Sequence, residues 1–178
     1  MKEREDIVAA VVAAAGGQLT GRVRLQKTVY LLDRLGLNSG FEYDYHHYGP
    51  YSRDLDNATA DAKAFSLVEE AFERRLSDGA MYSIFRLKGE AKKEALGDLD
   101  GDRAQELVNL FAQSNVTVLE LAATIDWLWH KEAYADWRGE ITRRKGVKVQ
   151  RGRLEKAVSL LAEIGLPPPE PAAIRAKA

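Results

Sequence analysis

The chain has 178 residues, of which 46% are hydrophobic and 30% are charged, with 26 Lys and Arg against 27 Asp and Glu. This length and composition predict a globular protein with a substantial core, which excludes disorder over the whole chain. The absence of cysteine excludes disulfides, thiolate metal sites and a cysteine nucleophile, and a net charge of -1 argues against a strongly basic nucleic-acid binder.

The apolar stretch near the start of the chain, residues 7–15, is far shorter than the roughly 20 residues that cross a bilayer. The residues before it carry more acids than bases, whereas a signal peptide begins with a positive region. We therefore predict a cytoplasmic protein that makes no contact with a membrane.

The first half of the chain alternates segments of helical and of period-two apolar spacing. In chain order, the spacing predicts helices over 3–15 and 25–35, a strand over 41–46, a helix over 52–65, and a hairpin with strands over 67–76 and 81–87. We expect Gly49-Pro50 to end the first strand, Ser52 to cap the third helix and Asp78-Gly79 to make the hairpin turn. This order is typical of a winged-helix module.

The second half of the chain is predicted to be helical. Apolar stripes indicate helices over 104–111, 117–128 and 154–164, with a capping box that begins at Thr117. A basic connection over 138–151 precedes the last of these helices.

The expected fold class is α+β, mostly α, in a single domain over 1–166. Its winged-helix-like part covers 1–88 and contains a small β-sheet, and its helical layer covers 89–166. The prolines from Pro167 to Pro171 predict a flexible, extended tail over 167–178.

Aromatic residues gather before the third predicted helix, where four of the seven tyrosines fall between Tyr43 and Tyr51. His46 and His47 are neighbours on a predicted strand and should point to opposite faces, which argues against a shared metal ion. Ser52 lacks the glycine-flanked turn of a serine nucleophile, so no catalytic residue, metal or cofactor is predicted. Tyrosines suit either a packed corner or an exposed recognition surface, and the sequence leaves both readings open.

Basic residues dominate the connection before the last predicted helix. The candidates for contact with an anion, a nucleic acid or an acidic partner are Arg143, Arg144, Lys145, Lys148 and Arg151. The alternative is a solvated segment whose charge offsets acidic residues elsewhere in the chain.

Two phrases of the sequence resemble a known group of proteins. Residues 24–36, RLQKTVYLLDRLG, and residues 41–55, FEYDYHHYGPYSRDL, resemble uncharacterised bacterial proteins of the YwgA-like type. More distantly, the helix with leucine, lysine and tyrosine and the Gly-Pro corner resemble the Panacea, or SocA-like, antitoxin domain. That resemblance implies a protein that neutralises a toxin by direct contact or acts as an adaptor.

We therefore predict a protein-binding module, antitoxin-like or adaptor-like, without enzymatic activity. The residues expected to contact the partner protein are Lys27, Tyr30, Tyr45, His47, Tyr48 and Tyr51. The alternative is a winged-helix DNA-binding transcriptional regulator, although the third predicted helix carries more acids than bases and would be repelled by phosphates.

Overall fold

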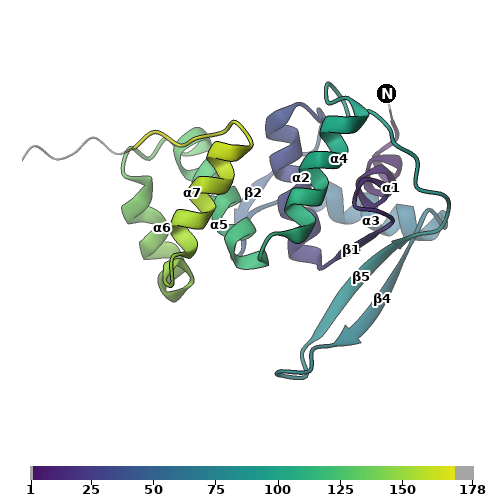
Figure 1. The fold of residues 1–178 in the computed structure, drawn as a ribbon, viewed down its shortest axis with the longest axis horizontal. Helices are drawn as coiled ribbons and strands as arrows, with labels where there is room; N and C mark the ends of the chain where they lie inside the picture. Colours follow the sequence, from purple (N-terminus) through teal and green to yellow (C-terminus); the bar gives the residue numbers. More distant parts are fainter. Residues whose placement is uncertain (1, 171–178) are drawn as a thin grey trace, which may run out of the picture. The chain divides into compact units, whose positions relative to one another are not determined.

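The structure is a computed structural model that describes residues 2–170. These residues form mostly helices, with a three-stranded and a two-stranded antiparallel sheet (Figure 1). The expected α+β class, mostly α with a helical C-terminal part, is confirmed. The chain divides into two compact units, Met1–Val116 and Thr117–Ala178. The expected single domain stays a prediction, and residues 171–178 of the expected tail lie outside the described residues.

The first unit is built on four helices whose apolar faces form its core. They are α1 (Arg4–Ala14), α2 (Arg22–Leu35), α3 (Arg53–Ala64) and α4 (Gly101–Gln113). Helix α1 packs against α3 and α4, and it buries the stripe of Ile7, Val8, Val11 and Val12 that helical spacing predicts.

The three-stranded sheet of this unit has the order β1-β5-β4, so β5 lies in the middle. Its strands are β1 (Gln18–Thr20), β4 (Val68–Arg74) and β5 (Met81–Leu87), and the predicted hairpin is confirmed. In the β1–β5 pair Leu19 lies opposite Phe85, and both side chains are buried. The sequence did not predict β1, because three residues between glycines are too few for a periodic pattern.

The second sheet is a short hairpin of β2 (Asp44–His46) and β3 (Gly49–Tyr51). We predicted that Gly49-Pro50 would end the strand, and this is wrong, because Pro50 lies within β3 opposite Tyr45. Both strands of a two-stranded sheet are edges, where a proline is tolerated if its nitrogen faces away from the ladder. The turn is possible because Gly49 adopts a positive φ of 88°.

The second unit contains only helical elements among its described residues. They are α5 (Val116–Asp126), the π-helix η1 (Trp127–Lys131), α6 (Trp137–Lys145), the 3-10 helix η2 (Gly146–Val149) and α7 (Arg153–Glu163). The expected basic connection over 138–151 is thus mostly α6 and η2.

The start of the predicted tail lies against α6. Trp137 Nε1 donates to the carbonyl oxygen of Pro169 at 2.5 Å, and Arg138 forms an ion pair with Glu170. Pro169 and Glu170 thus contact α6, and the flexibility of the tail stays a prediction. Along residues 2–170, none of the helices combines the length and apolar character that a bilayer span needs.

Candidate functional site

Two predicted contact residues, Lys27 and Tyr30, lie in the core rather than at the surface. Their side chains are 1% and 3% exposed, because α2 is buried continuously from Leu25 to Leu32. Lys27 Nζ donates to the carbonyl oxygen of Pro50 at 2.5 Å. We therefore correct the expectation that these two side chains support a binding surface, since Lys27 instead holds β3 against α2 and the Tyr30 ring packs edge-on against Tyr43.

The junction between β3 and α3 is fixed by a buried amide. Gln26 donates to the Ser52 carbonyl at 2.9 Å and accepts from the Ser52 N–H at 2.8 Å. The Ser52 hydroxyl accepts from the N–H of Leu55 at 3.2 Å, so the predicted helix cap is confirmed.

Two of the clustered tyrosines use their hydroxyls inside the fold. The Tyr43 hydroxyl donates to Asp33 at 2.6 Å, and burial together with this carboxylate raises the pKa of Tyr43. The Tyr51 hydroxyl donates to Asp56 at 2.5 Å, and that hydrogen bond raises the pKa of Tyr51. Tyr43 and the half-buried Tyr51 are thus packing residues of the corner.

The tip of the β2–β3 hairpin is open to solvent. His46 and His47 are exposed, Tyr48 is 49% exposed, and Tyr45 is half-buried. The His46 ring stacks on Tyr51 with a centroid distance of 4.4 Å. Within residues 2–170, no group of His, Asp and Glu side chains is arranged to hold a metal ion. Of the predicted contacts, His47 and Tyr48 are therefore the most accessible.

A groove of about 1190 Å³ lies in the first unit beside the β4–β5 hairpin, and Tyr48 is part of its wall. We call it the hairpin groove; its lining includes Arg22, Arg24, Tyr48, Phe72, Glu73, Arg74, Arg75, Leu76, Met81 and Val116. Phe72 is 58% exposed, Met81 is 54% exposed and Leu76 is fully exposed. The groove therefore offers large apolar side chains to solvent.

The charged lining of the hairpin groove is mostly basic. Four arginines stand against one glutamate, a local charge of four minus one, or +3. Arg24 is tied to the fold, since it donates to the carbonyl oxygens of Phe111 at 2.8 Å and Ser114 at 2.5 Å, and burial lowers its pKa. These bonds hold the end of α4 beside the start of α2.

A buried carboxylate anchors the hairpin to the helices. Both oxygens of Glu70 accept from Arg22 at 2.8 Å, and Lys63 and Ser83 each donate to Glu70 at 2.6 Å. Burial alone would raise the pKa of Glu70, but the bonds from Arg22, Lys63 and Ser83 outweigh it and lower the pKa to about 2. The carboxylate is thus a structural anion that joins α2, α3, β4 and β5.

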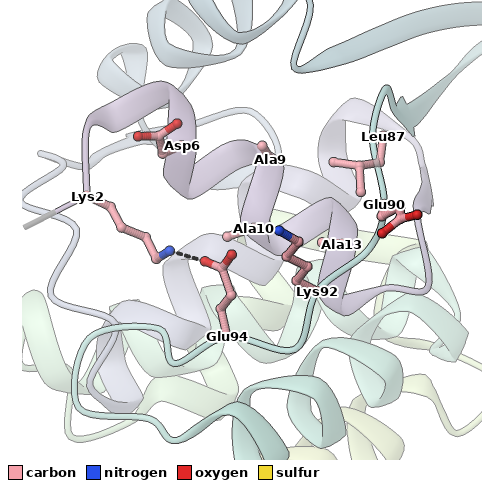
Figure 2. A pocket seen from close by; sticks show the side chains of 9 residues that line it. All are labelled: Lys2, Asp6, Ala9, Ala10, Ala13, Leu87, Glu90, Lys92 and Glu94. Carbon is pink, nitrogen blue, oxygen red and sulfur yellow. Dashed lines mark hydrogen bonds and ion pairs between the residues drawn. The ribbon is translucent and has the colours of Figure 1, made fainter.

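A smaller pocket of about 320 Å³ lies between α1 and the segment that follows β5 (Figure 2). Ala9, Ala10 and Ala13 line it on the side of α1, and the ion pair between Lys2 and Glu94 spans its mouth. Its lining mixes acidic and basic side chains with the three alanines, and Asp6 lies on the same side as the alanines, on α1. It lacks the combination of large apolar groups and excess charge that the hairpin groove has.

The predicted anion-binding residues of the second unit are largely paired with acids. Arg143 and Arg144 both donate to Glu140, and Arg144 also pairs with Glu132. These bonds lower the pKa of Glu140 to about 2.

A second acidic residue of this unit, Glu120, pairs with the next two basic residues of the predicted set. Lys145 and Lys148 both donate to Glu120, at 2.8 and 3.0 Å, and burial lowers the pKa of Lys145. Arg151, between η2 and α7, and Arg143 are the exposed members of the predicted set. Four of the five candidates thus pair with acids of their own unit rather than with the acidic residues elsewhere in the chain that we expected, and their contact with an anion or a nucleic acid stays a prediction.

Comparisons with known proteins give two relatives, and no protein-family model matches the chain. The chain is 29% identical over 129 residues to a protein of Thermus aquaticus named DNA ADP-ribosyl glycohydrolase, an alignment that covers 68% of this chain and 34% of that protein. It is 30% identical over 64 residues to the uncharacterized protein YwgA of Bacillus subtilis, covering 36% of this chain and 39% of YwgA. The second match supports a YwgA-like relationship.

The first relative corrects one expectation. We predicted that the chain has no enzymatic activity, and a relative that is named as a glycohydrolase contradicts this. The chain spans between one third and two fifths of the length of these two relatives. The activity of the whole glycohydrolase therefore enters only as a proposal.

Apart from Tyr48, the residues that line the hairpin groove were not predicted as contacts from the sequence. Leu76 and Met81 flank a turn that contains Ser77, Asp78 and Gly79, a place where exposed polar residues are usual. Large apolar residues at both ends of such a turn are the signal that could have identified the groove.

Proposed function

We propose that the first unit binds a partner protein through the hairpin groove, in the manner of an antitoxin or an adaptor. The observation that carries this proposal is the exposure of Phe72, Leu76 and Met81 together along one hairpin. Large apolar groups that are gathered at a surface are typical of protein interaction sites. Aromatic residues, methionine and arginine, which line this groove, are also enriched at such sites.

The anchoring of the hairpin supports the same proposal. Glu70 ties β4 to Arg22 and Lys63, so the apolar side chains beyond it project from a fixed base. A surface that is ordered before binding loses less conformational entropy when a partner arrives. The hairpin groove is therefore suited to a lasting contact with a folded protein.

The order of the elements suggests which known arrangement this unit follows. Helix α1, strand β1, helices α2 and α3 and the β4–β5 hairpin, with β5 in the middle of the sheet, fit a winged-helix module with the β2–β3 hairpin inserted. In this proposal the β4–β5 hairpin is the wing, and it contacts protein. The distant resemblance to the Panacea domain agrees with such a role.

A second candidate function comes from the glycohydrolase match. The chain would act on ADP-ribosylated DNA, the substrate that the name of the Thermus aquaticus relative indicates. Arg74 and Arg75 at the tip of the hairpin could contact the phosphates of such a substrate. The measurement is the release of ADP-ribose from a modified oligonucleotide by the purified chain.

The proposal is tested with a tagged chain that is co-expressed with the products of its neighbouring genes. Leu76→Ser combined with Met81→Ser removes two of the exposed apolar groups of the groove. Phe65→Ser combined with Val147→Ser is the matched control, because these side chains are 65% and 70% exposed and do not line the groove. A protein that the wild type and the control retain, and that the groove variant loses, is then purified and titrated against all three chains.

We expect the purified partner to bind the groove variant about tenfold or more weakly than the wild type, since buried apolar anchors dominate binding energy. Equal affinity for the groove variant and the wild type would contradict the proposed site. Release of ADP-ribose by the wild type, with no partner captured, would promote the second candidate.

A further inference from the structure

The outer edge of β4 presents unpaired backbone groups. Arg75 N–H donates to the Ala80 carbonyl at 2.8 Å, and Lys88 N–H donates to the Leu67 carbonyl at 2.9 Å, so the odd-numbered residues of this strand bond to β5. Successive residues of a strand direct their N–H and C=O groups to opposite edges. The backbone groups of Glu70, Phe72 and Arg74 therefore point away from β5.

This edge is the free side of the sheet. Strand β4 ends the order β1-β5-β4, and the hairpin extends away from the helices of its unit (Figure 1). The side chains from Phe72 to Arg74 are exposed, and β4 contains no proline. A straight, exposed edge strand is a template for a further strand.

We propose that a second copy of this chain pairs with this edge, strand β4 antiparallel to strand β4, with Phe72 opposite Phe72 of the second copy. The two-fold axis then passes through this aromatic pair. In this register Glu69 lies opposite Arg75 of the second copy, and Arg75 lies opposite its Glu69. The inference goes beyond the proposed partner groove, because it uses the strand edge.

The charges of β4 select this register over its neighbours. Only shifts that keep the outward-facing residues opposite one another preserve the ladder. The neighbouring register that places Phe72 opposite Glu70 of the second copy also places Glu69 opposite Glu73. The neighbouring register that places Phe72 opposite Arg74 also places Glu73 opposite Glu73 of the second copy. Like charges directly opposite one another destabilise a strand pair. The register centred on Phe72 avoids both contacts.

The groups that would meet are available at the surface. The side chains of Glu69 and Arg75 are about half exposed, and their contacts to Lys88 and Asp78 are solvent-exposed ion pairs. Exposed pairs of this kind exchange partners at little cost. Phe72, which is 58% exposed, would be covered by its own counterpart, so that in the dimer Leu76 and Met81 remain as exposed apolar side chains of the groove. Glu69, Arg75 and Phe72 of one copy would thus each meet a matching side chain of the second copy.

The sequence offers a direct test because it contains no cysteine. In a hydrogen-bonded antiparallel pair the Cα atoms lie about 5.5 Å apart, within the range that a disulfide spans. Phe72→Cys should therefore form a covalent dimer under mild oxidation. Arg74→Cys should not, since the two positions would lie about 14 Å apart along the strands. Phe65→Cys is the control, because Phe65 is equally exposed and lies outside the hairpin.

Sedimentation velocity of the full chain over a range of concentrations measures the non-covalent dimer. We expect the wild type to dimerise, and Arg74→Pro to remain monomeric because it removes an outward N–H while sparing the bonds to β5. Circular dichroism verifies that this variant is folded. If it is not, the charge variants carry the test: Glu69→Arg should raise the dimer dissociation constant about tenfold, and adding Arg75→Glu should restore it.

Two further variants distinguish pairing at the β4 edge from a change in net charge and from binding in the groove. Glu106→Arg on α4 changes the net charge as Glu69→Arg does and should leave the dimer intact. Met81→Ser weakens the groove but not the edge, so it should dimerise normally even where partner binding is lost. A wild type that stays monomeric at every concentration, or equal cross-linking of Phe72→Cys and Arg74→Cys, would overturn the proposal.

Discussion

Replacement of Glu70 by glutamine tests how the hairpin is held in place. Burial disfavours the Glu70 carboxylate, but the bonds from Arg22, Lys63 and Ser83 outweigh it and move its pKa from 4.5 to about 2. A difference of one in pKa corresponds to about 1.4 kcal/mol, so the carboxylate contributes at most about 3.5 kcal/mol. Its basic partners are partly exposed, and solvent screening reduces the expected loss for Glu70→Gln to about 2 kcal/mol.

The pH dependence of this loss has a defined sign. Because the pKa of Glu70 is lower in the folded state, its contribution is fully present above about pH 4.5 and is lost as the pH falls toward 2. The destabilisation by Glu70→Gln should therefore be large at pH 7 and small near pH 2.5.

Urea unfolding followed by circular dichroism is the assay. All three tryptophans lie in the second unit, so their fluorescence reports separately on that unit. Glu73→Gln is the matched control on the same strand, because Glu73 is half exposed and its ion pair to Arg86 at 3.6 Å should contribute less than about 1 kcal/mol. Equal losses for the two variants, or a loss for Glu70→Gln that does not change with pH, would refute the reasoning.

Four further predictions concern other parts of the chain. Ser52→Ala should cost about 1 kcal/mol of folding free energy and leave partner capture unchanged; a loss of capture in a folded variant would contradict this. Gln26→Ala leaves the buried Ser52 N–H unpaired, while the Ser52 carbonyl keeps its bond from the Asp56 N–H, and should cost about 2 kcal/mol, measured by the same urea unfolding. Glu120→Gln leaves Lys145 buried without a charged partner and should cost about 3 kcal/mol in the tryptophan-monitored transition, whereas an unchanged midpoint would show that the pair is not needed. Tyr48→Ala should weaken partner binding by about tenfold while the melting temperature changes little; the opposite pattern would make Tyr48 a core residue.

Local sequence signals were enough to predict much of the first unit. Helix α1 and the cap of α3 follow from apolar spacing and from Ser52, and the β4–β5 hairpin follows from its Asp-Gly turn. Each of these features depends on residues within one or two turns of the chain. Strand β1 is the exception, because its pairing with β5 is formed across more than 60 residues.

The candidate site was harder to predict, because burial depends on distant neighbours. Lys27 reads as an exposed helical cation, and its bond to the Pro50 carbonyl, 23 residues further along the chain, is not visible in the sequence. The tyrosines were recognised as a cluster, but the sequence does not show that Tyr43 and Tyr51 bond to Asp33 and Asp56. The hairpin groove could not be predicted for the same reason, because its walls come from distant segments: α2, the β4–β5 hairpin and the tip at Tyr48.

The most direct test of partner binding through the hairpin groove is hydrogen–deuterium exchange of the chain with and without its purified partner. The account predicts slower exchange in peptides that cover residues 70–84 and the start of α2, and little change in residues 138–151. Protection confined to residues 138–151, with the β4–β5 hairpin exchanging at its free rate, would contradict the account.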